Sequence, residues 1–237
     1  MNQPFAVFDI DGTLIRWQLY HALADALAHL GYFDPEAFEA VRQARLSWKQ
    51  RSHINSYKDY EHQLIKAYEQ ILTNLKVSQF NEAVDLVFEE YKDQVYTYTR
   101  DLIRKLKAKD YLLFAISGSQ TEIVNRIADY YGFDDFVGTR YMRVGNRFTG
   151  KMVLANSSKH LVLEKMVRRH AATQAGSLAV GDSESDISML ESVEHPIVFN
   201  PTQRLLSQAK ISGWPVIIER KNVIYKLETQ NGKYVLA

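Results

Sequence analysis

The strongest constraint on the fold lies at the start of the chain, where the apolar run Phe5–Phe8 leads into Asp9, Asp11 and Gly12. A short apolar run of this kind predicts a buried β-strand, and the Asp-Gly pair that follows predicts a turn. Two carboxylates therefore stand where the strand stops. We expect the rest of the chain to build a sheet around this strand and to complete a polar site at its end.

Later segments repeat the pattern of a short apolar strand followed by a helix. Alternation of strands with helices indicates crossover connections and a parallel sheet covered on both faces. The predicted fold class is therefore α/β, with a doubly wound parallel sheet. Strands are predicted at Tyr111–Ile116, Phe136–Tyr141, Ser177–Val180 and His195–Phe199, and helices at Arg100–Lys109, Gln120–Tyr131, Ser158–His170 and Ile187–Ser192.

The segment between Ile15 and about Val95 interrupts this alternation, because its apolar residues recur at helical spacing. One helix is predicted to end near Gly31, and three more follow. We expect residues 1–15 and 96–237 to form an α/β core, and residues 16–95 to form an inserted all-helical domain. The three later helices are predicted at Pro35–Lys49, Tyr57–Leu75 and Ser78–Tyr91.

Two hairpins are predicted outside the alternating pattern. One is the short segment Val144–Phe148 around Gly145-Asn146, and the other joins Val223–Thr229 to Lys233–Leu236 through Gln230-Asn231-Gly232. An Asn-Gly pair between apolar runs is a strong hairpin signal. The second hairpin could extend the sheet, cover an edge or bind another subunit, and the sequence leaves these alternatives open.

Three of the predicted strands end in polar clusters, which contain Asp9 and Asp11, then Ser117-Gly118, then Asp182 and Asp186. Sites in open parallel sheets collect beyond the carboxyl ends of the strands. We therefore expect the three clusters to share one site. Carboxylates gathered at one point repel each other unless a cation balances them, and oxygen ligands suit Mg²⁺. The alternative is that Asp182 caps a helix in a solvated acidic loop.

The segment around Ser117-Gly118 also suits an anion, because a hydroxyl and backbone N–H groups stand at the start of a predicted helix. A helix cap is the simpler interpretation if the segment is taken alone. Lys159 could add a positive charge to a bound phosphate, although a lysine at a helix start is usually exposed. Lys151 is the rival for this role.

The composition excludes several classes of function. The net charge is +1, which argues against a general polyanion binder, and aromatic residues that could stack on bases are not clustered among the basic residues of 140–169. We expect no nucleic-acid partner. The chain has no cysteine, no visible signal peptide and no apolar run approaching the ~20 residues that span a bilayer. A cytosolic protein without a membrane partner is predicted, and its oligomeric state stays open.

Taken in order, Asp9-Ile-Asp11-Gly-Thr13, Ser117, Lys159 and Gly181-Asp182-x-x-x-Asp186 resemble the four motifs of the haloacid dehalogenase superfamily of phosphohydrolases. The resemblance covers residues 1–15 and about 96–200. The helical insert after the first motif is similar to the cap domain of the phosphoserine phosphatase-like branch. A match to one motif arises easily by chance, whereas all four in order at strand ends do not.

The resemblance implies a role for each matching residue. Asp9 would attack phosphorus and form an aspartyl-phosphate, and Asp11 would protonate the leaving alcohol and then activate water. Ser117, the Gly118 backbone and Lys159 would hold the phosphoryl oxygens. Mg²⁺ would bind between Asp9, the Asp11 carbonyl and Asp182, and Asp186 would orient Lys159 or the water around the metal.

Asp11 also separates two reactions within this superfamily, because a departing alkoxide needs an acid whereas a halide needs none. The sequence therefore predicts an enzyme that hydrolyses a small phosphorylated metabolite. Transfer of the phosphoryl group to another alcohol, as in mutases, is one alternative. A phosphoanion-binding regulatory module without turnover is the other.

Departures from the family pattern bear on the substrate. Gln18 stands where phosphoserine phosphatases carry the cap glutamate that receives the substrate ammonium, and Ser119 replaces the second glycine of their phosphate loop. A neutral amide pairs poorly with an ammonium, so phosphoserine itself is not predicted. Gln18, Arg45 and Arg51 are the cap candidates for contact with substrate. Arg45, Trp48 and Arg51 recur at helical spacing and could line one face of a helix. A solvated stripe of side chains is the simpler interpretation.

Overall fold

The computed structural model describes residues 3–155, 158–230 and 232–237 of the chain. It divides into two compact units. The first unit comprises Met1–Gln18, Glu90–Thr139 and Leu154–Ala237, and the second comprises Leu19–Glu89 and Arg140–Val153. The first unit holds the sheet, and the second holds helices and a hairpin.

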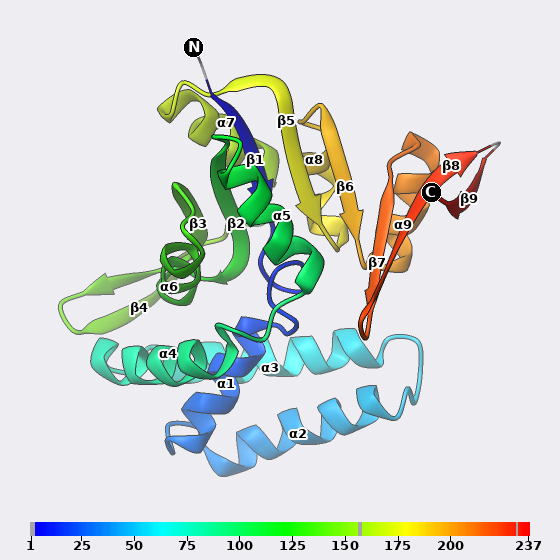
Figure 1. Ribbon diagram of the computed structural model, residues 1–237. Coiled ribbons are helices and arrows are strands. Elements are labelled where there is room, and N and C mark those ends of the chain that lie inside the picture. The colour runs from blue at the N-terminus through cyan, green and yellow to red at the C-terminus, as the bar shows by residue number, and fades with distance from the viewer. Residues whose placement is uncertain (1–2, 156–157, 231) are drawn as a thin grey trace. The chain divides into compact units, whose positions relative to one another are not determined.

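The sheet of the first unit is built around β1 (Pro4–Phe8), the strand predicted from the opening residues (Figure 1). Strands β2 (Leu112–Gln120) and β5 (Thr173–Gly181) pair with it on its two sides, both in parallel. The order across the sheet is β3-β2-β1-β5-β6-β7-β8-β9, and pairing is parallel from β3 to β7. The predicted α/β class with a mostly parallel sheet is confirmed. The outer strands are β3 (Asp135–Val144), β6 (His195–Phe199), β7 (Val216–Arg220), β8 (Val223–Gln230) and β9 (Lys233–Leu236).

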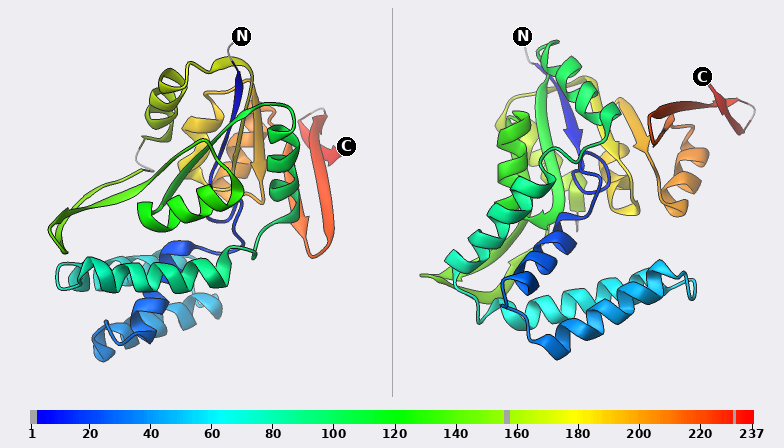
Figure 2. Two further views of the ribbon diagram at one scale, coloured as in Figure 1. Left: turned by 60° about the vertical axis from the view of Figure 1, so that its left-hand side comes forward. Right: turned by 60° about the horizontal axis from the view of Figure 1, so that its bottom comes forward.

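Helices cover both faces of this sheet, as the alternation of side chains along β1 shows. Phe5 and Val7 belong to a buried cluster that includes residues of the last three core helices. Phe8 points to the opposite face, where its ring lies 5.9 Å from that of Phe133. The core helices are α5 (Thr97–Lys107), α6 (Thr121–Tyr131), α7 (Lys159–Arg169), α8 (Ile187–Leu190) and α9 (Gln203–Ser212) (Figure 2).

The second unit contains four helices, but it is not all helical, and this corrects the predicted division at residues 15/16 and 95/96. The far half of β3 pairs with β4 (Arg147–Val153) in an antiparallel hairpin that belongs to this unit. Phe148 of the hairpin packs at 5.3 Å from Phe80, and a bridge joins Arg147 to Lys76. Apolar contacts that the local pattern cannot reveal thus draw the hairpin to the helices. The helices are α1 (Leu19–His29), α2 (Pro35–Lys49), α3 (Ser56–Leu72) and α4 (Val77–Tyr91), the last of which runs past the unit boundary at Glu89.

The C-terminal hairpin predicted from the sequence is formed by β8 and β9, and it extends the sheet through antiparallel pairing with β7. Of the predicted turn, Asn231 lies outside the described residues. Helix α9 and strand β7 were not predicted. Among the residues that the structure describes, no helix combines the length and apolarity needed to cross a membrane.

Candidate active site

The predicted polar clusters meet at one edge of the sheet. Strands β1, β2 and β5 are parallel neighbours, so their carboxyl ends lie side by side. Asp9 and Asp11 follow β1, and Asp182 follows β5. Ser117-Gly118 does not follow its strand as predicted but lies within it, because β2 continues to Gln120 before α6 begins.

Lys159 lies at the centre of the charged part of the site. It is the first residue of α7 and only 1% exposed. Its Nζ atom donates to Asp9 Oδ1 at 2.6 Å, to Asp186 Oδ1 at 2.5 Å and to the carbonyl of Ile116 at 3.0 Å. Burial alone would lower the pKa of Lys159, but the carboxylates of Asp186 and Asp9 outweigh it and raise the pKa above its ordinary value. Lys159 is therefore a buried cation, whereas its rival Lys151 is exposed on β4 in the second unit.

Asp186 connects this lysine to the loop that follows β5. Its Oδ1 accepts from Lys159, and its Oδ2 accepts from the backbone N–H groups of Asp182 at 3.1 Å and Ser183 at 3.0 Å. The Ser183 hydroxyl donates to the same oxygen at 3.2 Å. Gly181 allows this close packing, since a Cβ there would lie 2.5 Å from the Asp186 side chain. Asp186 thus fixes both the lysine and the backbone that carries Asp182.

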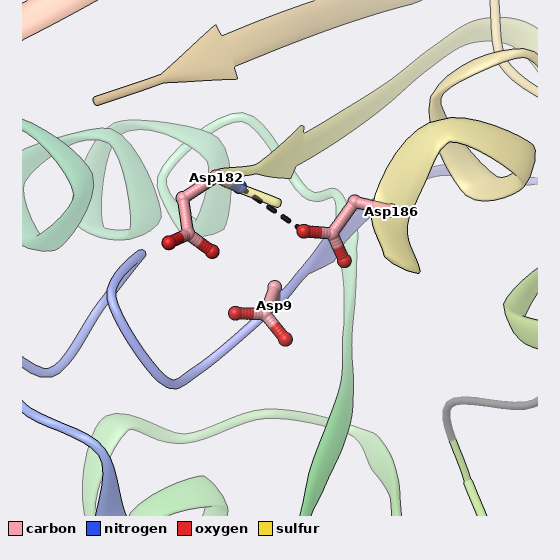
Figure 3. A group of neighbouring side chains, drawn as sticks. All are labelled: Asp9, Asp182 and Asp186. Atoms are coloured by element: carbon pink, nitrogen blue, oxygen red, sulfur yellow. Dashed lines mark hydrogen bonds between the residues drawn. The ribbon is translucent and has the colours of Figure 1, made fainter. Parts of the chain in front are cut away.

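Three carboxylates converge beside Lys159. Asp9, Asp182 and Asp186 each offer an oxygen within 4.8 Å of the other two, and Figure 3 shows their side chains turned toward a common space. Burial raises the pKa of Asp9 to about 7, against the opposing effect of Lys159 and with the help of Asp186 and Asp11. Burial and the charges of Asp9 and Asp186 likewise raise the pKa of Asp182 well above its ordinary value. One lysine does not neutralise these groups, so the site favours a further cation.

The loop after β1 approaches Asp182 closely. Gly12 has a φ of +82°, and a Cβ at this position would lie 2.4 Å from Asp182 Oδ2. The Thr13 hydroxyl donates to Asp182 Oδ1 at 3.4 Å. Glycine is therefore required here both by the backbone conformation and by the carboxylate opposite.

Asp11 lies in a different environment from Asp9. The Ser117 hydroxyl donates to Asp11 Oδ2 at 2.5 Å, and the Ser119 hydroxyl donates to Asp11 Oδ1 at 3.0 Å. The backbone N–H of Ser119 in turn donates to Ser117 Oγ at 2.9 Å. The carboxylate of Asp11 is not part of the converging group, although the predicted metal ligand was its backbone carbonyl. Gly118 lies between the two serines and is half-buried.

Two contributors to the site were missed by sequence reasoning. Ser119 was noted as a departure from the family pattern but not as a contact of Asp11, to which its hydroxyl donates. Thr99 of α5 is fully buried, and its hydroxyl donates to the carbonyl of Thr13 at 2.9 Å. The serine pair at alternate positions was a usable signal for the first, whereas no local pattern marked the second.

The three cap candidates, Gln18, Arg45 and Arg51, lie in different parts of the structure. Gln18 ends the first segment of the first unit and is half-buried. Arg45 belongs to the second unit, where its guanidinium bonds Asp25 at 2.7 Å and the Tyr60 hydroxyl at 3.0 Å. Arg51 lies beyond the end of α2, with a φ of +52°, so it does not share a helix face with Arg45. The backbone turns before Arg51 can continue the stripe.

Comparisons with known proteins agree with this geometry. The model of the haloacid dehalogenase-like hydrolases matches residues 6–191. A probable phosphatase of Mycobacterium tuberculosis is 26% identical over 221 residues, which cover 90% of this chain and 74% of that protein. A histidinol-phosphatase of Neisseria meningitidis is 23% identical over 227 residues, which cover 90% of this chain and 97% of that protein.

A solved structure of phosphoserine phosphatase with an analogue of its phospho-aspartyl intermediate shares the fold. The TM-score is 0.62 at 21% identity, and the match covers 93% of this chain and 95% of that chain. The resemblance to the phosphoserine phosphatase-like branch is thereby confirmed at the level of the fold. Because the family model spans well over half of the sequence, this protein belongs to the haloacid dehalogenase-like hydrolases.

Proposed function

We propose that this protein is a Mg²⁺-dependent phosphatase that hydrolyses a small phosphate monoester through an aspartyl-phosphate intermediate. The observation that carries the proposal is the buried contact of Lys159 with Asp9 and Asp186, at the sheet edge where Asp11 and Asp182 also lie. The other features of the site supply the remaining steps of the reaction.

Asp9 is the proposed nucleophile. Lys159 holds its Oδ1 at 2.6 Å, which fixes the carboxylate and favours its ionised form. A carboxylate oxygen of Asp9 forms a bond to phosphorus while the bond from phosphorus to the leaving oxygen breaks. The buried cation lowers the repulsion between an anionic nucleophile and an anionic ester, which is the main electrostatic obstacle to this step.

Asp11 is the proposed acid and base. Its proton goes to the leaving oxygen, so the product departs as an alcohol rather than an alkoxide. Asp11 then takes a proton from the water that attacks phosphorus, and the bond between phosphorus and Asp9 breaks to release inorganic phosphate. The Ser117 hydroxyl, the Gly118 N–H and Lys159 are the proposed donors to the phosphoryl oxygens.

The converging carboxylates fit a Mg²⁺ ion. Asp9 and Asp182 would provide hard oxygen ligands, and Gly12 leaves free the space beside Asp182 that a Cβ would fill. The Asp11 carbonyl would be a third ligand, as the family resemblance implies. Asp186, whose two oxygens already accept from Lys159 and from the loop backbone, orients the lysine rather than serving as the main ligand. When bound, the ion supplies charge neutralisation for the phosphoryl group.

The substrate is proposed only as a class. The similar proteins are named for histidinol phosphate and phosphoserine, which are small phosphate esters that carry an amino group. Gln18 offers a neutral amide, whereas the ammonium of such a substrate would pair better with a carboxylate. A small phosphorylated metabolite other than phosphoserine is therefore proposed. We further propose that the helical insert, residues 16–95, acts as a cap with a role in specificity, with Gln18, Arg45 and Arg51 as candidate contacts. The cytosolic location and the lack of a nucleic-acid partner stay predictions.

Replacement of the nucleophile is the direct test. Asp9→Asn should lower phosphate release from 4-nitrophenyl phosphate by at least about 10³-fold, since phosphoryl transfer to the amide is blocked. Asp129→Asn, which changes an exposed carboxylate on α6, is the matched control and should leave the rate unchanged. EDTA should suppress wild-type turnover and added Mg²⁺ should restore it. Undiminished turnover by folded Asp9→Asn protein would contradict the assignment of the nucleophile.

The same assay separates hydrolysis from transfer to another alcohol. Free phosphate should account for all of the 4-nitrophenol released when a competing alcohol is present. A phosphorylated acceptor in excess of free phosphate would favour the phosphotransferase alternative instead.

A further inference from the structure

The two serines of the β2 segment hold the two oxygens of one carboxylate. Ser117 Oγ donates to Asp11 Oδ2 at 2.5 Å, and Ser119 Oγ donates to Asp11 Oδ1 at 3.0 Å. Both serines are buried, with exposures of 0% and 2%. Phosphate binding accounts for Ser117, but nothing in the proposed reaction yet uses Ser119.

An irregularity in β2 places Ser119 at this carboxylate. Ile116 pairs with Val137 and Gln120 pairs with Thr139, so β2 takes four residue steps where β3 takes two. The extra residues form a bulge that contains both serines. Gly138 of β3 accommodates it, because a Cβ there would lie 2.9 Å from the Ser119 carbonyl oxygen and 2.7 Å from Thr121 Cα. The position of Ser119 is thus built into the sheet.

Substrate binding would give the two serines different hydrogen-bond acceptors. A hydroxyl has one hydrogen to donate, so Ser117 cannot donate to Asp11 and to a phosphoryl oxygen at the same time. When Ser117 turns to the phosphoryl group, Asp11 Oδ2 loses this donor. Ser119 has no such competing duty in the proposed reaction, and it keeps its bond to Oδ1.

We propose that Ser119 is a positioning residue for proton transfer by Asp11. It holds Oδ1 so that Oδ2, released by Ser117, faces the leaving oxygen and carries the proton. The proton passes from Asp11 Oδ2 to that oxygen as the bond from phosphorus to the leaving oxygen breaks and the bond from phosphorus to Asp9 forms. This inference rests on the proposed phosphatase function and assigns to Ser119 a part in one step of it.

The dependence on the leaving group distinguishes positioning from mere packing. Phenolate is a much poorer leaving group than 4-nitrophenolate, so phenyl phosphate needs the proton from Asp11 far more. The two esters share the phenyl phosphate group and differ by one nitro substituent, so each variant is compared with the wild-type protein on each ester. A fault in proton transfer therefore lowers turnover of phenyl phosphate selectively, whereas a general distortion of the site lowers turnover of both.

The experiment compares kcat/KM for phenyl phosphate and 4-nitrophenyl phosphate with Mg²⁺ present. Since this ratio covers the steps up to departure of the phenol, slow breakdown of the intermediate does not mask the effect. Ser119→Ala and Ser119→Gly should each lower the value for phenyl phosphate by about 10- to 100-fold, because misplaced catalytic groups cost about that much, and the value for 4-nitrophenyl phosphate by less than about threefold. Ser207→Ala, on the exposed side of α9, is the control and should change neither.

Each other outcome contradicts the inference in its own way. If the folded Ser119 variants lost kcat/KM equally on both esters, Ser119 would have only a packing role. If they lost it on neither ester, Ser119 would have no role in the reaction. A selective loss in Ser119→Gly without one in Ser119→Ala would point to the backbone rather than the hydroxyl, and would also overturn it. If the wild-type protein released phosphate from neither ester, the proposed function itself would fail, and this inference with it.

Discussion

The two aspartates of the opening motif are two residues apart but lie in contrasting environments. Asp9 is bound by the buried ammonium of Lys159, whereas Asp11 is bound by the neutral hydroxyls of Ser117 and Ser119. An ammonium favours the ionised form of a carboxylate, while a hydroxyl can donate to either form of its neighbour at small cost. The partners of a carboxyl group, more than its place in the sequence, thus suit it to attack or to proton transfer.

Removal of the Lys159 cation should have the largest effect on stability and activity. Lys159→Met would leave Asp9 and Asp186 buried without their shared partner, and such a change typically costs about 3–5 kcal/mol of unfolding free energy. Phosphatase activity should fall by at least about 10³-fold. Chemical denaturation and turnover of 4-nitrophenyl phosphate measure the two effects. Lys165→Met, at an exposed position of α7, is the matched control.

Added Mg²⁺ should restore part of the stability lost by Lys159→Met, because a bound cation can replace some of the missing positive charge. Activity should stay low even so, since the proposed contact to the phosphoryl group is missing. Full stability of Lys159→Met without metal would show that the carboxylates do not depend on the lysine.

A change in the environment of Asp11 should have an intermediate effect on stability and activity. Gly138→Ala would place a Cβ within 3 Å of the backbone at Ser119 and Thr121, which no side-chain rotation can relieve. Overpacking of this kind typically costs about 1–3 kcal/mol. We expect the variant to unfold earlier in denaturant and to lose phenyl phosphate turnover more than 4-nitrophenyl phosphate turnover. The Lys159 contacts should persist, so an equal loss on both esters would indicate that the two environments are not separable.

The smallest expected effect is a dependence of stability on pH in metal-free protein. The pKa of Asp9 is raised to about 7 in the folded state, from 3.8 in its ordinary state. Between these values the folded protein binds more protons than the unfolded chain, so this group makes stability fall as pH rises. Unfolding in EDTA should therefore need more denaturant at pH 5 than at pH 8. Asp9→Asn should weaken the dependence; an unchanged slope in that variant would exclude Asp9 as its source.

The sequence predicted the sheet and the charged part of the site because both follow local patterns. The apolar runs before Asp9 and Asp182 marked parallel strands, and parallel strands align their carboxyl ends. Lys159 was preferred to Lys151 only through the order of the motifs, and its burial could not be read from the helix that it begins. The predicted bounds of α2 and β6 agree with the observed ones.

What the sequence did not predict depends on contacts between distant residues. Ser119 reaches Asp11 through a bulge that arises from the register of β2 against β3, and the hairpin of residues 140–153 joins the helices through Phe148 and Phe80. Helix α9 was missed because Leu205 and Ala209 are its buried residues and polar side chains fill most of the rest. Register and long-range packing have no signature in a local window.

The shared bond of Lys159 to Asp9 and Asp186 also fixes the formal charge that an incoming ion meets. When Asp9, Asp182 and Asp186 are all ionised and Asp11 is in its proton-donating form, three carboxylates and one ammonium leave two negative charges in the cluster. A single divalent ion cancels them, whereas an alkali ion falls short and a lanthanide exceeds them. Through this charge, the lysine would make the site favour a divalent ion over an ion of another valence.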